Sequence, residues 1–151
     1  MILGGLAGNL RGTPDVTTDL DICYDRSREN LQRLAAALQE LGAHLRGARE
    51  DVSPAFPIDA QSLALGDTFT FTTDAGDLDV LATPSGTGGY GDLSADATAF
   101  EVAHDLVIDV ASIQDLIRMK RASGRTKDRL LESLGALLEE SEAFEGRAGD
   151  A

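Results

Sequence analysis

The sequence contains a single cysteine, Cys23, so no disulfide can form within the chain, and nothing indicates an oxidising compartment. No apolar run reaches the roughly 18 residues that cross a bilayer. The N-terminus has no basic region followed by a long apolar stretch, which a signal peptide would need. We therefore expect a cytoplasmic protein that neither spans nor binds a membrane.

Two common nucleotide-binding motifs are also absent. Gly4-Gly5 is not followed by the Gly-Lys-Ser/Thr of a Walker A loop, and the chain has no G-x-G-x-x-G fingerprint. These absences disfavour a P-loop enzyme and a dinucleotide-binding fold. A kinase-like or hydrolytic phosphoryl enzyme is accordingly the weakest of the functions that we consider.

The charge of the chain is strongly one-sided, with a formal net charge of −13. This charge opposes tight, sequence-blind binding to nucleic acid. The basic residues are nevertheless concentrated: the segment 118–129 holds both lysines and six of the 13 basic residues, namely Arg118, Lys120, Arg121, Arg125, Lys127 and Arg129. An acidic chain with one basic segment is typical of a protein that binds a small anion locally.

The chain length of 151 residues fits one domain, which we place at 1–145, followed by a flexible tail at 146–151. Residue patterns predict strands at 1–3, 19–24, 43–47, 68–73, 77–81 and 106–110. They predict helices at 27–42, 112–124 and 126–143, and one helical turn near 59–65. Residues 4–8 read as a glycine-rich turn before a short helical piece ending near 10. The segment 84–91 reads as a loop, and 94–103 fits either a helix or a strand.

Two pairs of aspartates stand on predicted strands, Asp19/Asp21 and Asp77/Asp79. With 17 aspartates in 151 residues, about two D-x-D pairs are expected by chance, so their number carries no information. Their placement is informative. Side chains alternate between the two faces of a strand, so both members of a pair point to one face, about 7 Å apart along the strand. Such carboxylates can converge on one or two hard cations. The alternative is a pair of solvated strand faces.

The Gly4-Gly5 pair follows a predicted strand and precedes a helical piece. Backbone N–H groups in such a turn can bind a phosphate. A plain tight turn is the alternative for this feature taken alone.

Together these features resemble the nucleotidyltransferase superfamily of the DNA polymerase β type. GGLAGNLRGTPDVTTDLDI is similar to the opening motif of the small nucleotidyltransferases of abortive-infection and toxin–antitoxin systems. GDLDVLATPSG is similar to their third-carboxylate strand, and VIDVASIQDLIRMKRASGRTKDRLLESLGAL to their C-terminal signature. The resemblance covers most of the chain and implies an α/β (α+β) nucleotidyltransferase fold. In that fold helices flank a mixed β-sheet, and a helical pair closes the chain.

The resemblance also implies roles for individual residues. Gly4 and Gly5 would face the triphosphate, Asp19 and Asp21 would be metal ligands, and Asp79 would be the third carboxylate and help to deprotonate the acceptor. Asp77 is the nearest alternative to Asp79. The resemblance places a last group of side chains at or near the nucleotide phosphates: Lys120, Arg125, Lys127 and Asp128. A solvated junction between two helices is the alternative for that group.

The implied activity is transfer of a nucleoside monophosphate from an NTP, with Mg²⁺ or Mn²⁺, to an RNA end such as a tRNA, a protein hydroxyl or a small molecule. The alternative is a catalytically weak or inactive member that acts as a partner protein in a toxin–antitoxin or phage-defence pair. The short chain, which has no separate acceptor-binding domain, favours this alternative. Many relatives have an arginine where this chain has Asp15, so a substrate contact made by that arginine is missing here. The sequence leaves the oligomeric state open.

Overall fold

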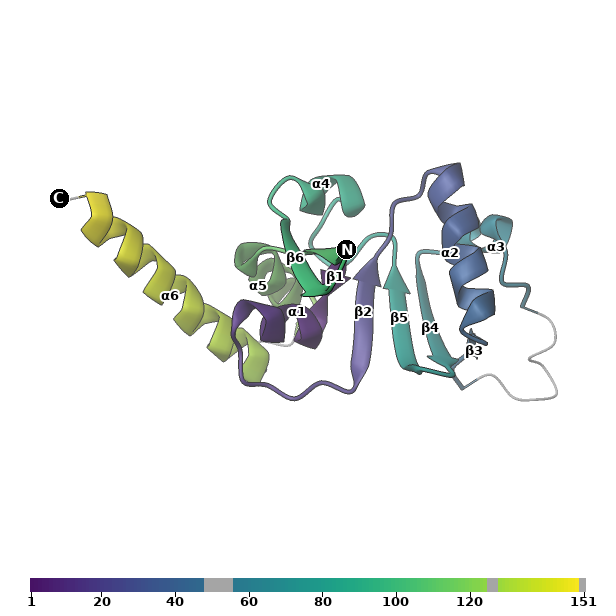
Figure 1. The fold of residues 1–151 in the computed structure, drawn as a ribbon, viewed down its shortest axis with the longest axis horizontal. Helices are drawn as coiled ribbons and strands as arrows, with labels where there is room; N and C mark the ends of the chain where they lie inside the picture. Colours follow the sequence, from purple (N-terminus) through teal and green to yellow (C-terminus); the bar gives the residue numbers. More distant parts are fainter. Residues whose placement is uncertain (48–55, 125–127, 150–151) are drawn as a thin grey trace.

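A mixed seven-stranded sheet runs through the part of the chain that the computed structural model describes, residues 1–47, 56–124 and 128–149 (Figure 1). The strand order is β3-β4-β5-β2-β1-β7-β6. β2 pairs in parallel with β5, and β1 with β7, whereas the other pairs are antiparallel. The strands are β1 Ile2–Leu3, β2 Asp19–Cys23, β3 His44–Leu45, β4 Thr68–Thr73, β5 Gly76–Leu81, β6 Thr98–Ala103 and β7 Leu106–Val110. The predicted α/β class with a mixed sheet is confirmed.

Six helices accompany the sheet in these residues. They are α1 Gly4–Arg11, α2 Arg28–Glu40, α3 Ala60–Leu65, α4 Tyr90–Ser94, α5 Ile113–Ala122 and α6 Arg129–Gly149. None of the described helices is long and apolar enough to cross a membrane. α5 starts as predicted, because the Ser112 side chain accepts a hydrogen bond from the Asp115 N–H at 3.0 Å.

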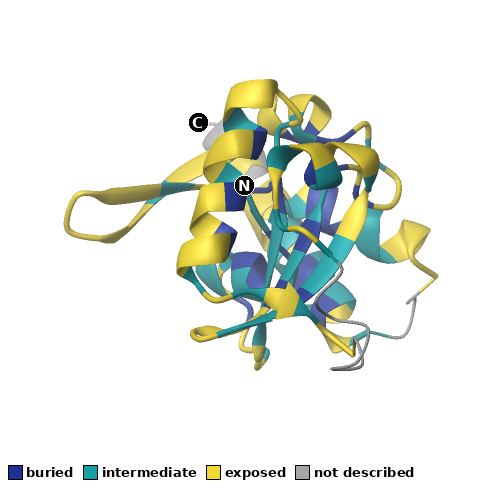
Figure 2. Ribbon diagram, turned by 90° about the vertical axis from the view of Figure 1, so that its right-hand side faces the viewer, coloured by how far each residue is buried: buried dark blue, intermediate teal, exposed yellow. Residues whose placement is uncertain are grey.

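Two hydrophobic clusters hold the fold together. The first packs α2 and α3 against β4, β5 and β2, and its largest fully buried side chains are Phe71, Leu38, Leu63 and Val80. The second joins α1, α4, α5 and the start of α6 to β1 and β7, through Leu3, Val110, Leu116 and Leu134 among others. Buried residues lie along the central strands and on the inward sides of the helices (Figure 2).

Side chains of β2 alternate between the two faces of the sheet, so its acidic residues lie on the face opposite the first of these clusters. Leu20 and Ile22 pack against the cluster beneath α2, and Asp19 and Asp21 point to the other face. This arrangement confirms the predicted strand and its predicted polar face.

The glycine-rich segment after β1 is a helix and not the predicted turn. α1 begins at Gly4 and includes Gly5 and Gly8. Packing explains the difference, since a Cβ on Gly8 would lie 2.5 Å from Cδ1 of Leu130 in α6. The absence of a side chain thus lets α1 approach α6 closely, and this tertiary contact outweighs the low helix propensity of glycine.

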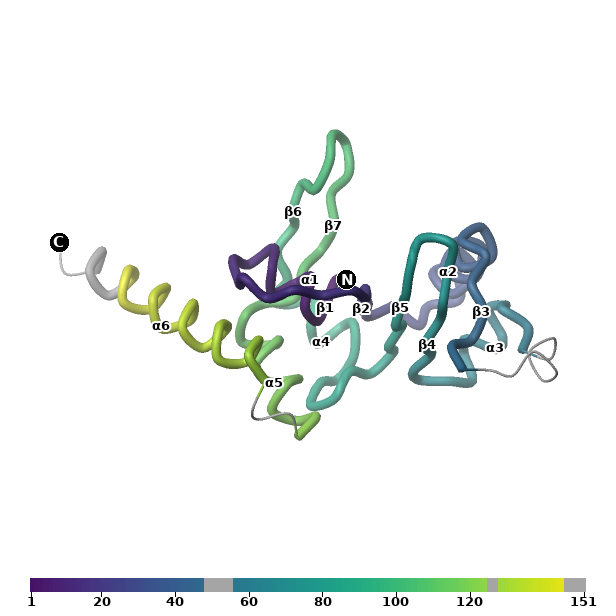
Figure 3. The backbone as a smooth tube through the Cα atoms, turned by 90° about the horizontal axis from the view of Figure 1, so that it is seen from below, coloured from purple at the N-terminus to yellow at the C-terminus, as the bar shows by residue number. Residues whose placement is uncertain are grey.

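Other boundaries differ from the sequence analysis in smaller ways. The ambiguous segment 94–103 contains the end of α4 and the strand β6, and the predicted strand 43–47 is reduced to His44–Leu45. α6 continues past its predicted end at 143 to Gly149, into the segment predicted as a tail. β6 and β7 form a hairpin arm that projects from the body (Figure 3).

Candidate active site

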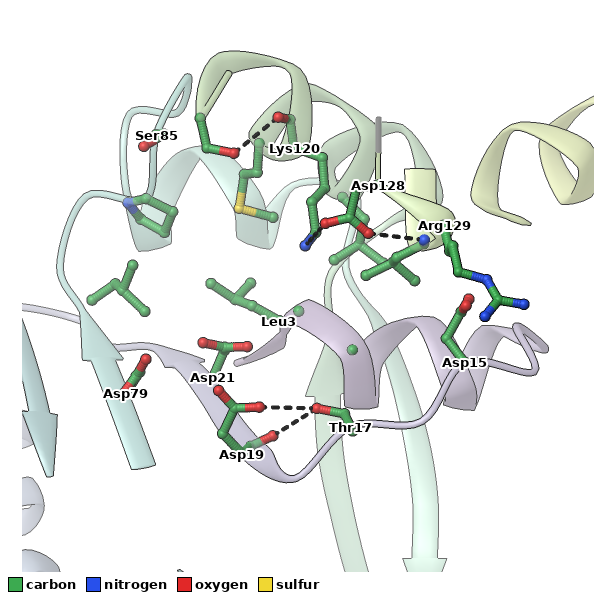
Figure 4. A pocket seen from close by; sticks show the side chains of 18 of the residues that line it. Leu3, Asp15, Thr17, Asp19, Asp21, Asp79, Ser85, Lys120, Asp128 and Arg129 are labelled. Carbon is green, nitrogen blue, oxygen red and sulfur yellow. Dashed lines mark hydrogen bonds and ion pairs between the residues drawn. The ribbon is translucent and has the colours of Figure 1, made fainter. Parts of the chain in front are cut away.

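An open cleft with a volume of about 1700 Å³ lies beside the second hydrophobic cluster, which contributes Leu3, Leu116 and Leu130 to its lining. Strands β2 and β5 form one wall, with Asp19, Asp21 and Asp79. The C-terminal end of α5 and the start of α6 form the other wall, with Lys120 and Asp128. Gly4 and Gly5, at the start of α1, also line it. Figure 4 shows Asp19, Asp21 and Asp79 on one side of this space, and Lys120 with Asp128 on the other.

The parallel pairing of β2 with β5 brings the two predicted acid pairs together. Asp19 is the register partner of Asp77, and Asp21 is the register partner of Asp79. Neighbouring strands lie about 4.8 Å apart, so these carboxylates from distant parts of the sequence share one face of the sheet.

The two candidates for the third carboxylate differ in their surroundings. Asp79 lines the cleft and its side chain is 22% exposed. Asp77 lies nearer the outer end of β5, is not among the residues that line the cleft, and accepts a hydrogen bond from Thr72 Oγ1 at 3.1 Å. The geometry therefore favours Asp79 over Asp77 for chemistry inside the cleft.

The start of α1 is adapted to the close approach of β2. Gly4 has a φ of +61°, and a Cβ on this residue would overlap the Asp21 carboxylate. A Cβ on Gly5 would lie 2.7 Å from Cβ of Thr17. The N-cap is Leu3, whose side chain offers no acceptor to the first turn. The positive end of the α1 dipole thus faces the cleft beside Asp21, which suits an anion.

Thr17 fixes the position of Asp19. Its hydroxyl donates to the Asp19 backbone carbonyl at 3.1 Å and lies 3.2 Å from Oδ1 of the Asp19 carboxylate. This local motif ties the loop before β2 to the strand. Thr17 is a site residue that was not predicted, although a threonine two residues before a strand acid is a detectable signal in the sequence.

Arg46, directly after β3, is a site residue that the sequence analysis missed. Its Nη2 donates to Oδ1 of Asp79 at 2.9 Å and to the Phe71 carbonyl at 3.2 Å, and its Nε lies 3.5 Å from Oδ2 of Asp77. The Arg46 backbone N–H also donates to the Thr70 carbonyl at 2.9 Å. The guanidinium therefore reaches across β4 and pairs with the acidic face of β5.

Lys120 extends into the cleft from α5. Its Nζ donates to Oδ2 of Asp128 at 2.8 Å, and Oδ1 of Asp128 accepts from the Leu130 N–H at 2.9 Å (Figure 4). Asp128 therefore caps the start of α6 and holds Lys120 at the cleft wall at the same time.

The basic segment is divided between structure and site. Arg118 bridges α4 and α5, with its Nη2 at 2.8 Å from carboxylate oxygens of both Asp92 and Asp115. The Gly88 N–H and the Arg118 guanidinium lower the pKa of Asp92 below its usual range. Arg118 is thus a structural cation. Arg125 and Lys127, both predicted near the phosphates, lie outside the described residues.

Asp15 stands on the loop at the rim of the cleft. Its Oδ2 is buried and has no hydrogen-bond partner within residues 1–47, 56–124 and 128–149. The rim thus offers a carboxylate where many proteins of the resembled family offer an arginine.

The donor groups of the cleft are mainly carboxylates. Six carboxylates and three cationic side chains line the described part of the cleft. A triphosphate would meet an excess of negative charge there unless cations accompanied it. Carboxylate oxygens in register on neighbouring strands are suitable ligands for Mg²⁺ or Mn²⁺.

The arrangement of these donors is open. Among the described residues, no three His, Cys, Asp or Glu side chains are gathered tightly enough to form a ready-made metal site. The donor types and their common face fit the ion, but one of the carboxylates, Asp79, is already paired with Arg46.

Comparison with known proteins gives no identification. No protein-family model matches the sequence, and no curated protein matches it significantly. The nucleotidyltransferase resemblance therefore remains a prediction that rests on the motifs quoted above.

Proposed function

We propose that this chain is a metal-dependent nucleotidyltransferase that transfers the nucleoside monophosphate of an NTP to an acceptor hydroxyl. The observation that carries the proposal is the register of Asp21 with Asp79 on parallel strands, beside the start of α1 and across a cleft from Lys120. A carboxylate wall, a helix N-terminus and a lysine are the groups that a metal–triphosphate requires.

The chemistry of such a transfer distributes roles among these residues. Asp19, Asp21 and Asp79 would hold the divalent cations, which when bound neutralise the triphosphate and the leaving pyrophosphate. The acceptor oxygen would bond to the α-phosphorus as the bond to the β-phosphate oxygen breaks, and Asp79 would take the acceptor proton. The start of α1 and Lys120 would orient the phosphates, so that catalysis depends mainly on positioning and charge.

Calorimetry tests the binding half of this proposal. Mn²⁺ with each non-hydrolysable NTP analogue would be titrated into wild type, into Asp19→Ala/Asp21→Ala and into Asp74→Ala/Asp96→Ala. The last variant loses the same charge at two exposed residues outside the cleft. We expect binding by wild type and by the control, and a large loss in the Asp19/Asp21 variant. Equal binding by all three proteins would refute the site.

Label transfer tests the chemical half. NTPs labelled at the α-phosphate, incubated with the protein and lysate, should label an acceptor in an Asp19/Asp21-dependent way, whereas γ-labelled NTPs should not. Transfer of the γ-label would instead indicate a kinase-like enzyme, and release of γ-phosphate alone would indicate a hydrolase.

A second candidate is a catalytically weak or inactive partner protein. The β6–β7 arm favours it, because Val102, Leu106 and Val107 on this arm are 41%, 51% and 60% exposed. Exposed apolar groups on a projecting element are typical of protein contacts. This candidate predicts that the chain co-purifies with the product of the neighbouring gene. Replacing these three residues by serine should abolish the co-purification, whereas Asp19→Ala/Asp21→Ala should retain it. The same protein should show no label transfer.

A further inference from the structure

We infer that Arg46 competes with the divalent cation for Asp79, so that the cation binds tightly only together with a triphosphate that draws Arg46 away. Arg46 thereby becomes a positioning residue that couples the two ligands. This inference rests on the proposed function and adds to it an order of dependence between cation and nucleotide.

The first argument is the geometry of the pair. The Arg46 Nη2 lies 2.9 Å from Oδ1 of Asp79, and the two side chains are only 34% and 22% exposed. A charge-assisted hydrogen bond of this length, partly shielded from water, is stronger than an open surface pair. A dication bound to the same carboxylate would compete with this hydrogen bond and would be repelled by the guanidinium beside it.

Second, Arg46 is anchored by its backbone, and its guanidinium lies within reach of the cleft. The backbone N–H of Arg46 is held by the Thr70 carbonyl, and its guanidinium also contacts the Phe71 carbonyl. The same side chain lines the cleft and retains exposed area toward it. A planar guanidinium binds phosphate oxygens as readily as carboxylates, so a triphosphate in the cleft offers it an equivalent partner.

The third argument is the balance of charge across the cleft. Two cations that line it are engaged by carboxylates: Arg46 by Asp79, and Lys120 by Asp128. A metal–triphosphate carries both signs of charge. It can therefore give its cation to Asp79 and its phosphates to Arg46, and no carboxylate is left without a positive partner. The metal alone would leave Arg46 beside a dication, which is repulsive.

The consequence is a positive coupling between the two ligands, which by linkage must be reciprocal. Removing the guanidinium should then have effects of opposite sign. Without nucleotide, Arg46→Gln should bind Mn²⁺ roughly tenfold more tightly than wild type, a change within the usual range of coupling. With Mn²⁺ present, the same variant should bind the triphosphate more weakly than wild type. A residue with a merely structural role would not improve one affinity while lowering the other.

The experiment is calorimetry with Mn²⁺ alone, and then with an α,β-imido triphosphate of each base at saturating Mn²⁺. The proteins are wild type, Arg46→Gln, Arg46→Lys and Arg26→Gln. Arg46→Lys keeps the charge and should fall between wild type and Arg46→Gln. Arg26 does not line the cleft, and it pairs with Asp67 at 3.5 Å. Arg26→Gln therefore removes the same charge as Arg46→Gln and should behave as wild type. Circular dichroism and thermal unfolding would confirm that each variant is folded.

The possible outcomes separate this inference from the proposed function. Opposite changes in Arg46→Gln, absent from Arg26→Gln, support the competition. If wild type binds Mn²⁺ and triphosphate but Arg46→Gln leaves the Mn²⁺ affinity unchanged or lower, Arg46 does not compete, and only this inference is overturned. If neither wild type nor Arg46→Gln binds Mn²⁺ or triphosphate, the proposed function fails and this inference with it.

Discussion

The Asp21 carboxylate lies against the Cα of Gly4, in the space that a Cβ would occupy at that position. This contact joins the first turn of α1 to the acidic face of β2. Gly4 also has a φ of +61°, in the left-handed region that favours glycine.

Replacing Gly4 by alanine should therefore destabilise the fold and displace Asp21. We expect a loss of about 2 kcal/mol in the free energy of unfolding, from backbone strain and overlap together. Gly135→Ala is the matched control. Gly135 lies inside α6, and no atom lies near the position that a Cβ would take there. This substitution should stabilise the fold by up to ~1 kcal/mol. Urea unfolding of both variants measures the difference, and equal effects would contradict this account of Gly4.

The two candidates for the third carboxylate can be separated by mutation. Asp79→Asn should weaken binding of Mn²⁺ with a triphosphate by roughly tenfold or more, about 1.4 kcal/mol. Asp77→Asn should change it little, because Asp77 does not line the cleft. Calorimetry on the two isosteric variants makes the comparison, and a larger loss from Asp77→Asn would reverse the assignment.

The division of the basic segment predicts that two neighbouring cations have different effects. Arg118→Met should lower the free energy of unfolding by ~2 kcal/mol, because it leaves the buried Asp115 without its ionic partner. Lys120→Met should change stability less but weaken triphosphate binding. Unfolding curves and calorimetry on both variants test this prediction. It fails if Lys120→Met binds the triphosphate as wild type does.

Cys23 gives the fold a dependence on alkaline pH. Burial raises the pKa of its thiol to about 11, from an ordinary value of 9.0. The neutral thiol is preferred by the folded state, so its contribution is fully present below pH 9 and is lost as the pH rises to 11. The full difference of about two pKa units corresponds to about 2.8 kcal/mol, and roughly 2 kcal/mol of it should be lost by pH 11, where the thiol of the folded state is half ionised.

Comparison of Cys23→Ala with wild type isolates this effect from other groups. The difference in unfolding free energy between the two proteins should be constant at neutral pH and shrink between pH 9 and 11. A difference that does not vary over this window would show that the thiol ionises equally in both states.

Local patterns were enough to predict β2, β5 and α5, which carry most of the candidate site. The alternation of Asp19, Leu20, Asp21 and Ile22 fixed both the strand and its polar face, because strand periodicity is a property of consecutive residues. The capping pattern at Ser112 likewise located the start of α5. Lys120 followed from its place in the C-terminal motif.

The remaining features depend on contacts between distant segments. Nothing in the local sequence specifies that β2 pairs with β5 in the register that joins Asp21 to Asp79. Arg46 falls within the predicted strand 43–47, but its role appears only when β4 and β5 lie beside it. The helical state of Gly4 depends on packing of α1, which local glycine propensity opposes.

The register between β2 and β5 also protects the folding of the chain. If either strand slipped by one residue, its side chains would exchange faces, and its pair of carboxylates would be driven into the cluster beneath α2. Burial of two charged carboxylates would cost far more free energy than the backbone hydrogen bonds of the shifted strands could supply. The acids that we propose for chemistry therefore also disfavour one-residue slips of the central strands while the chain folds.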